Sequence, residues 1–431
     1  MLGAYANAFR TPDLRRKLLF VLLIIAVFRF GSQIPTPGVD VTNVQACFQA
    51  TKNQGLYGLI NLFSGGALLQ LTVFALGIMP YITASIILQL LVVVIPRLEN
   101  LKNEGQAGQT KITQYTRYLT LALAILQATG ITALARSGNL LQGCNKPLLY
   151  NESSLWTMML MVVTMTAGTV IIMWLGELIT DRGIGNGMSI LIFASVVSRL
   201  PAQGSAIWSQ GSKFQFFTII VIGIAMIVGI VFVESGQRRI PVQFAKRVVG
   251  RRMYGGQSTY IPLKVNQSGV IPVIFASSIL SFPALIASAL GDNFTGMQEW
   301  INDNLVNHQG WWYIGFYTLL IIFFSYFYTA IQFDPHRQAD QIRKQGGFIP
   351  GIRPGPPTEK YLAKVLNRIT LPGAIFLMII ALVPLLVFKL WNISQFPFGG
   401  TALLITVGVA LETMKQIDSQ LMMRNYEGFL A

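Results

Sequence analysis

Residues 214–233 read Phe214-Gln-Phe-Phe-Thr-Ile-Ile-Val-Ile-Gly-Ile-Ala-Met-Ile-Val-Gly-Ile-Val-Phe-Val233, a run without a single charged side chain. A helix needs roughly 20 largely apolar residues to cross the hydrocarbon core of a bilayer, so this run predicts a transmembrane helix. Nine further apolar runs follow the same pattern on either side of it. They cover residues 18–34, 71–95, 118–135, 156–175, 188–200, 270–290, 311–333, 371–391 and 400–411.

The composition agrees with a membrane protein and excludes several other classes. The chain has 431 residues, of which 53% are hydrophobic and only 11% are charged, against about 25% charged in an average soluble protein. The 40 glycines and 19 prolines are tolerated inside membrane helices, where neighbouring helices satisfy the freed backbone groups. Two cysteines are too few for a metal cluster or a disulfide scaffold.

The basic residues are distributed unevenly between the predicted loops. The formal net charge is +15, and with ten spans both termini lie on the same side. Twenty-five of the 32 Lys and Arg residues then fall on the side of the termini, and six fall on the other. Because cytoplasmic loops carry the excess of Lys and Arg, we expect both termini to face the cytoplasm.

Two of the predicted cytoplasmic loops, residues 234–269 and 334–368, are long and each carries seven Lys or Arg residues. Attraction to anionic lipid accounts for such charge in many membrane proteins. Most connections are only a few residues long, however, so topology alone does not require loops of this length. We expect them to form a docking surface for a large partner.

An internal similarity divides the chain into two halves, residues 1–200 and 201–431. Residues 77–88 align with 269–280, with the glycine, the proline and the Ala-Ser pair in the same places. Each copy belongs to the second helix of a five-helix half, so the two copies run in opposite directions. This inverted repeat is typical of secondary transporters with a pathway between the halves, and a transporter of small solutes is the alternative hypothesis.

The predicted spans contain little that could do chemistry. Arg29 is the one clear charge inside a span, whereas ion-coupled transporters usually place charges at mid-membrane. The two histidines, His308 and His336, fall in loops on opposite sides, and no metalloprotease, hydrolase or phosphate-loop motif is present. We therefore expect no enzyme activity, no catalytic residues, no bound metal and no cofactor.

Three polar or glycine-rich features remain open to two interpretations. Residues 61–69, Asn61-Leu-Phe-Ser-Gly-Gly-Ala-Leu-Leu69, form either a re-entrant turn that fills a gap or a movable stopper. Gln89 and Asn266 end the two similar helices and serve either an interhelical hydrogen bond or a function. Cys47 and Cys144 both fall in predicted external loops, where a disulfide is chemically permitted.

Several motifs together resemble the SecY family, the channel subunits of bacterial protein translocons. They occur in the family's order along nearly the whole chain. They are Ile34-Pro-Thr-Pro-Gly38, Asn61-Leu-Phe-Ser-Gly-Gly-Ala67, Leu76-Gly-Ile-Met-Pro-Tyr-Ile-Thr-Ala-Ser85, Thr113-Gln-Tyr-Thr-Arg-Tyr118, Trp174-Leu-Gly-Glu-Leu-Ile-Thr180, Gly183-Ile-Gly-Asn-Gly187, Lys264-Val-Asn266, Phe348-Ile-Pro-Gly-Ile-Arg-Pro-Gly355 and Phe398-Gly-Gly-Thr401.

The resemblance implies an all-α polytopic membrane protein with an hourglass pore between two inverted five-helix halves. It implies a plug over about residues 57–70 that includes Asn61, Phe63, Ser64, Gly65 and Gly66. A lateral gate with Gln89 and Asn266 would open between the second and third spans and the seventh and eighth. The implied pore ring consists of Ile78, Ile82, Met188, Ile192, Ile274 and Ile405.

The resemblance also implies partners and a location. The basic residues Lys246, Arg251, Arg252 and Arg353 would bind the motor ATPase SecA or the ribosome, the latter through ribosomal RNA phosphates. SecE and SecG would be membrane partners, and signal peptides and nascent chains would be the passengers. The expected location is the bacterial cytoplasmic membrane, with anionic lipids around the basic loops.

Overall fold

The computed structural model describes residues 11–50, 64–68, 70–136, 147–150, 154–201, 213–244, 247–249, 252–254, 258–289, 310–391 and 400–427, with single positions at 204, 205, 208, 300 and 304. Helices dominate these residues, and each of the ten predicted spans overlaps one of them. The helices that contain the spans are α2 (Pro12–Gly31), α5 (Met79–Val94), α7 (Gln106–Arg136), α8 (Leu155–Arg182), α9 (Gly187–Val197), α11 (Lys213–Ser235), α12 (Ile271–Ala289), α14 (Trp311–Gln332), α16 (Pro356–Trp391) and α17 (Gly400–Glu427).

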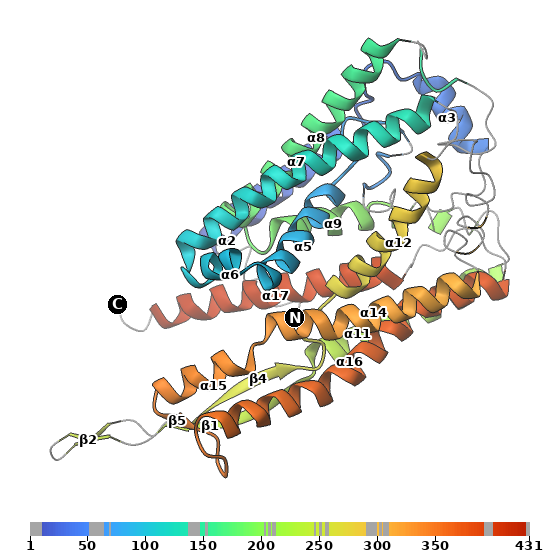
Figure 1. Cartoon of the computed structure of the whole chain (residues 1–431). Helices are drawn as coiled ribbons and strands as arrows, with labels where there is room; N and C mark the ends of the chain where they lie inside the picture. The colour runs from blue at the N-terminus through green and yellow to red at the C-terminus, as the bar shows by residue number, and fades with distance from the viewer. Residues whose placement is uncertain are drawn as a thin grey trace.

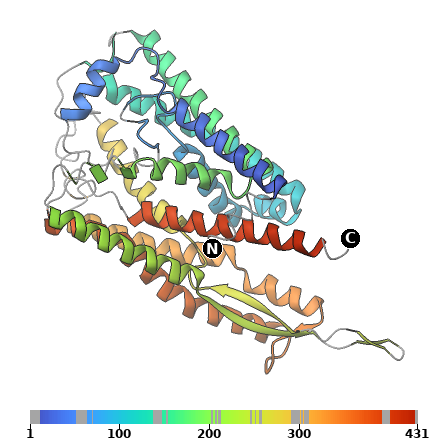
Figure 2. The same cartoon turned by 180° about the vertical axis from the view of Figure 1, so that it is seen from behind.

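The helices are arranged in two groups (Figure 1). Helices α2, α5, α7, α8 and α9 lie on one side, together with the short helices α3 (Val41–Ala50) and α6 (Pro96–Asn103). Helices α11, α14 and α16 lie on the other side with α15 (Pro335–Lys344), and α12 and α17 lie between the groups. Seen from behind, α11 runs along α17 (Figure 2), which also contacts α9 and α16.

The outer surfaces of the helices are apolar, as expected for helices in lipid. On α11, Phe214 and Phe232 are 76% and 78% exposed, and Val221 and Val228 are exposed between them. A soluble protein rarely leaves so continuous an apolar face in water. Five described helices are long and apolar enough to cross a membrane, or six if α5 and α6, bent by 100° at their junction, count as one span.

The second predicted span starts later than the sequence pattern indicated. Residues 71–78 form turns, and the helix begins only at Met79. Pro80 in the first turn is suited to a helix start because its missing N–H has no helical partner there. Gly77 precedes it with φ +57°, a conformation that ends any helix arriving from the N-terminal side.

The two long basic loops contain a small sheet to which the sequence prediction assigned no strand. Strand β1 (Gln237–Phe244) pairs antiparallel with β4 (Ser258–Lys264) on one edge and with β5 (Gly347–Phe348) on the other. The short strands β2 (Arg247–Val249) and β3 (Arg252–Tyr254) pair beyond them, and this arm projects away from the helices (Figure 1). Because β5 belongs to the second loop, the two loops form one structural unit.

An apolar core fixes this unit to the membrane helices. Ile240 and Val242 point inwards from β1, and Leu263 joins them from β4. Ile342 of α15 and Leu362 of α16 cover them from the other loop. The second loop is therefore shorter than predicted, because residues 356–368 already belong to α16.

Helices α8 and α9 pack closely where two glycines face each other. A Cβ on Gly187 would lie 1.9 Å from the backbone oxygen of Gly176, and a Cβ on Gly176 would lie 2.4 Å from the sulfur of Met188. Asn186 caps α9 by accepting hydrogen bonds from the backbone N–H groups of Met188 and Ser189. The Gly-rich stretch therefore places the start of α9, and with it Met188, directly against α8.

Gly187→Ala should destabilise the protein by about 1–3 kcal/mol, because the added methyl group must push the α8 backbone aside. Gly315→Ala is the matched control, since a Cβ there meets nothing within 4 Å and its φ is not positive. The control should leave the thermal unfolding midpoint in detergent unchanged or slightly raised. Equal midpoints for the two variants would contradict the close packing.

Candidate functional site

The central apolar cluster brings all six predicted ring residues together. Ile78 and Ile82 come from α5 or its N-cap, Met188 and Ile192 from α9, Ile274 from α12 and Ile405 from α17. Five of the six are buried members of this one cluster, and Ile82, partly buried, packs against it. Helices α5 and α9 belong to the first group and α12 and α17 lie between the two groups (Figure 1), so the cluster lies on the face of the first group that meets α12 and α17.

The described part of the predicted plug is a tight turn seated beside this cluster. Asn61 and Phe63 lie outside the described residues, whereas residues 64–68 form turns. The backbone N–H of Leu68 donates to the Ser64 hydroxyl at 3.1 Å, which closes the turn. Ala67 joins the central cluster, and Leu68 is fully buried in a second cluster with residues of α7 and α8.

Two arginines contact the glycines of this turn. Arg29 of α2 donates from Nη1 to the backbone oxygen of Gly65 at 3.3 Å. Gly66 has φ +100°, and a Cβ on it would overlap the guanidinium of Arg199, just past the end of α9. Arg29, the one clear charge inside a predicted span, thus binds the backbone of the turn. No role for Arg199 follows from the sequence, because its contact spans more than 130 residues of chain.

The structure does not bring the two predicted gate residues together. Gln89 is exposed on α5, and its side chain donates to the hydroxyl of Ser85 at 3.4 Å. Asn266 is buried before α12 and donates to the Glu234 carboxylate at 3.1 Å. Neither of these hydrogen bonds joins the two residues to each other, and their role in a gate stays a prediction. What joins α5 to α12 and α14 instead is an apolar seam of Ile86, Phe275 and Phe324.

Of the four predicted docking residues, Arg353 alone has a side chain that the structure describes. It is exposed in the second loop, next to Ile352, which packs into the core beneath the sheet. Its backbone oxygen accepts a hydrogen bond from the buried Thr358 hydroxyl at 2.9 Å, which fixes the turn. No ion pair within the described part of the chain involves Arg353, so its charge is available to a partner. Lys246 and Arg251 lie outside the described residues, and Arg252 is placed on β3 by its backbone alone.

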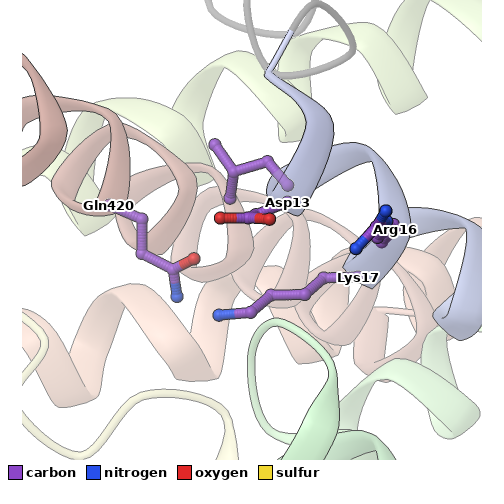
Figure 3. A pocket seen from close by; sticks show the side chains of 5 residues that line it. Asp13, Arg16, Lys17 and Gln420 are labelled. Atoms are coloured by element: carbon purple, nitrogen blue, oxygen red, sulfur yellow. The ribbon is translucent and has the colours of Figure 1, made fainter.

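A separate cavity of about 310 Å³ lies between the start of α2 and the last part of α17. Asp13, Arg16, Lys17 and Gln420 line it, with the Lys17 side chain extended towards Gln420 (Figure 3). It carries both signs of charge and lies away from the central cluster. In the described residues no group of three or more His, Cys, Asp or Glu is placed to hold a metal ion.

Cys47 is fully buried, and no free cysteine is found among the described residues. Cys144 lies outside the described residues. The pairing of the two cysteines therefore stays a prediction.

Solved structures share this fold at low sequence identity. One described as "The structure of a protein conducting channel" superimposes with a TM-score of 0.61 at 18% identity and covers 93% of this chain and 91% of that chain. Another, "Sec61 in the Canine ribosome-channel complex from the endoplasmic reticulum", has a TM-score of 0.59 at 17% identity with the same coverage.

Comparison with known sequences is more specific. The family model described as SecY matches residues 72–414. The protein translocase subunit SecY of Streptomyces galbus is 62% identical over 437 residues, and the alignment covers the whole of both chains. The protein of the same description from Mycobacterium bovis is 56% identical over 441 residues, again with full coverage. The chain belongs to the SecY family.

Proposed function

We propose that this chain is the central subunit of a protein-conducting channel that passes unfolded polypeptides across a membrane. The observation that carries the proposal is the meeting of six apolar side chains from α5, α9, α12 and α17 in one cluster. A narrow constriction of branched apolar side chains excludes water and ions. Such side chains also bind no peptide sequence strongly, so chains of any sequence can pass. The name shared by the full-length relatives agrees with this activity and not with the transport of small solutes.

We assign residues 57–70 to a plug that closes the pore at rest. The turn at 64–68 is supported in this role by its place between two apolar clusters. Arg29 donates to a backbone oxygen of the turn, and the guanidinium of Arg199 lies against Gly66. Neither arginine is bound by an acidic side chain of the turn. A contact of this kind holds the turn in place yet leaves it free to move out when a polypeptide enters.

We assign the seam between α5 and the pair α12 and α14 to a lateral gate. Ile86, Phe275 and Phe324 form it, and the two phenylalanine rings stack at 5.2 Å. Apolar contacts are non-directional, so an apolar segment of a signal peptide or a transmembrane helix can replace one side of the seam at little cost. Gln89 is exposed on α5, and its side chain would face the signal peptide or transmembrane segment that enters the gate.

The joined basic loops form the proposed docking surface. Arg353, Arg252, Lys246 and Arg251 would contact a motor ATPase such as SecA or the ribosome, and RNA phosphates would bind them without sequence preference. The likeness to a channel solved with a ribosome supports this assignment. SecE and SecG as subunits, anionic lipids around the loops, and a bacterial cytoplasmic membrane with both termini inside complete the proposal. The chain itself would hydrolyse nothing, so its partners supply the energy.

A photo-crosslinking residue at Ile274 should crosslink to a secretory polypeptide stalled halfway through export in membrane vesicles. Ile274 is buried in the central cluster, and Ile279 on the same helix, 40% exposed, serves as the lipid-facing control. Crosslinks at Ile274 and not at Ile279 are expected. A stalled chain that never crosslinks at Ile274 would place the pathway elsewhere.

Gly66→Ala should raise the resting ion conductance of the channel in planar bilayers several-fold, because the methyl group displaces the turn from Arg199. Gly105→Ala is the control: its φ of +74° imposes similar backbone strain, but its Cβ meets nothing within 4 Å. Conductance equal to wild type in Gly66→Ala would remove the seal function of the turn.

Arg353→Glu should lower motor-driven export about tenfold or more while the protein stays folded, because it reverses an exposed, unpaired charge on the docking surface. Lys102→Glu makes the same change of charge on α6, also exposed, and should leave export near the wild-type rate. Export is measured as precursor protected from protease in vesicles. The docking assignment fails if the two variants export equally.

A further inference from the structure

A half-buried acid lies at the end of α11 beside the start of the gate helix α12. The Glu234 carboxylate accepts a hydrogen bond from the side-chain amide of Asn266 at 3.1 Å. The same amide group donates to the backbone oxygen of Gly269 at 3.0 Å. Both N–H donors of the Asn266 amide are thus used on protein groups. The residue is only 4% exposed. The pore, the plug and the docking surface make no use of Glu234.

The network continues from Asn266 to α14. The hydroxyl of Ser268 donates to the side-chain oxygen of Asn266 at 3.2 Å and lies 3.4 Å from the hydroxyl of Ser325. Both serines are buried, at 3% and 2% exposed. Four polar side chains, Glu234, Asn266, Ser268 and Ser325, thus link α11, the segment before α12, and α14. We refer to these four residues as the polar clasp.

The backbone on either side of the clasp is also fixed. The N–H of Val265 donates to the oxygen of Gly236 at 3.0 Å, which extends the pairing of β1 and β4 to the clasp itself. Lys264, Lys415 and Glu412 lie near enough to Glu234 for their charges to act on its carboxylate. Burial raises the pKa of the Glu234 carboxyl, whereas the hydrogen bond from Asn266 and the charges of the two lysines act in the opposite direction.

The opposite side of α12 has a different chemistry. Towards α5 the described contacts form the apolar seam of Ile86 with Phe275 and Phe324, with Ile82 and Ile271 packed beside it. Hydrogen bonds are directional and costly to leave unmade when buried, whereas apolar surfaces exchange one partner for another. On the α11 and α14 side, α12 packs through Val273, Ala276 and Leu280, and the segment that leads into it is fixed by the polar bonds of the clasp. Towards α5 the contacts are apolar and replaceable.

We propose that the polar clasp is the fixed side of the lateral gate and that Glu234 is a positioning residue for gating. When the gate opens, α12 parts from α5 along the seam while the segment just before it stays bound to α11 and α14. This inference rests on the proposed channel function. In this proposal Asn266 anchors the gate helix, whereas the resemblance implied that Asn266 belongs to the gate opening.

The first experiment locks each side of α12 in turn. In Ser268→Cys with Ser325→Cys, the hydroxyl separation of 3.4 Å suits a disulfide after small adjustments. In Ile86→Cys with Phe275→Cys, a short bismaleimide joins the two sides of the seam. Formation of each crosslink is measured as the loss of alkylated thiols by mass spectrometry, relative to the number of thiols in the wild-type protein. Function is measured as the insertion of a transmembrane segment into vesicles.

The channel locked at the clasp should insert the segment at no less than half the wild-type rate. The channel locked across the seam should lose at least tenfold. If the clasp lock blocks insertion as strongly as the seam lock, α12 must leave α14 during opening and the proposal is wrong. Failure of wild-type protein to insert or export anything would instead contradict the proposed function.

The second experiment tests Glu234 through signal discrimination. Export is compared between a precursor with a normal signal peptide and one with a shortened apolar core. Glu234→Ala should raise the relative export of the weak-signal precursor several-fold, because a loosened α12 parts from α5 more easily. Glu234→Gln should restore the wild-type ratio, since its side-chain oxygen still accepts from Asn266.

Glu412→Ala is the matched control, because it removes a neighbouring acid that acts on Glu234 through charge alone. It should leave the export ratio unchanged. An unchanged ratio in folded Glu234→Ala, or an equal change in Glu412→Ala, would overturn the positioning role.

Discussion

The contact on which the rest of the structure depends is apolar and joins the first group of helices to α12 and α17, which lie between the two groups. Helices α5, α9, α12 and α17 meet there through isoleucine, methionine and valine side chains. Burial of such side chains stabilises this arrangement without fixing it by directional bonds. A channel that must open for a polypeptide and close behind it needs this kind of contact at its narrowest point.

Directional contacts occur around this centre and not within it. Arg29 binds the backbone of the turn at residues 64–68, and the polar clasp binds the segment that leads into α12. The β5 strand ties the two basic loops together at the surface. Each of these contacts holds one element in a defined place, while the apolar centre allows the elements to move relative to one another.

Much of this fold was predictable from the sequence, because apolar runs of span length have few alternatives to a membrane helix. The resemblance supplied the six ring residues, and the structure gathers all six. The sheet was missed although β1 buries alternate residues, Ile240 and Val242, a period-two signal masked by flanking charges and a proline. The polar clasp could not be found from sequence, since Glu234 and Asn266 are 32 residues apart and no local pattern pairs them.

The arm formed by β1 and β4 has a mechanical consequence. Its two strands begin and end next to Glu234 and Asn266, with Gln237 paired to Lys264 at the base. A force applied along these two strands is therefore transmitted to the segment that leads into α12. Under the docking proposed above, a partner bound to the joined basic loops would act on α12 from outside the apolar helices.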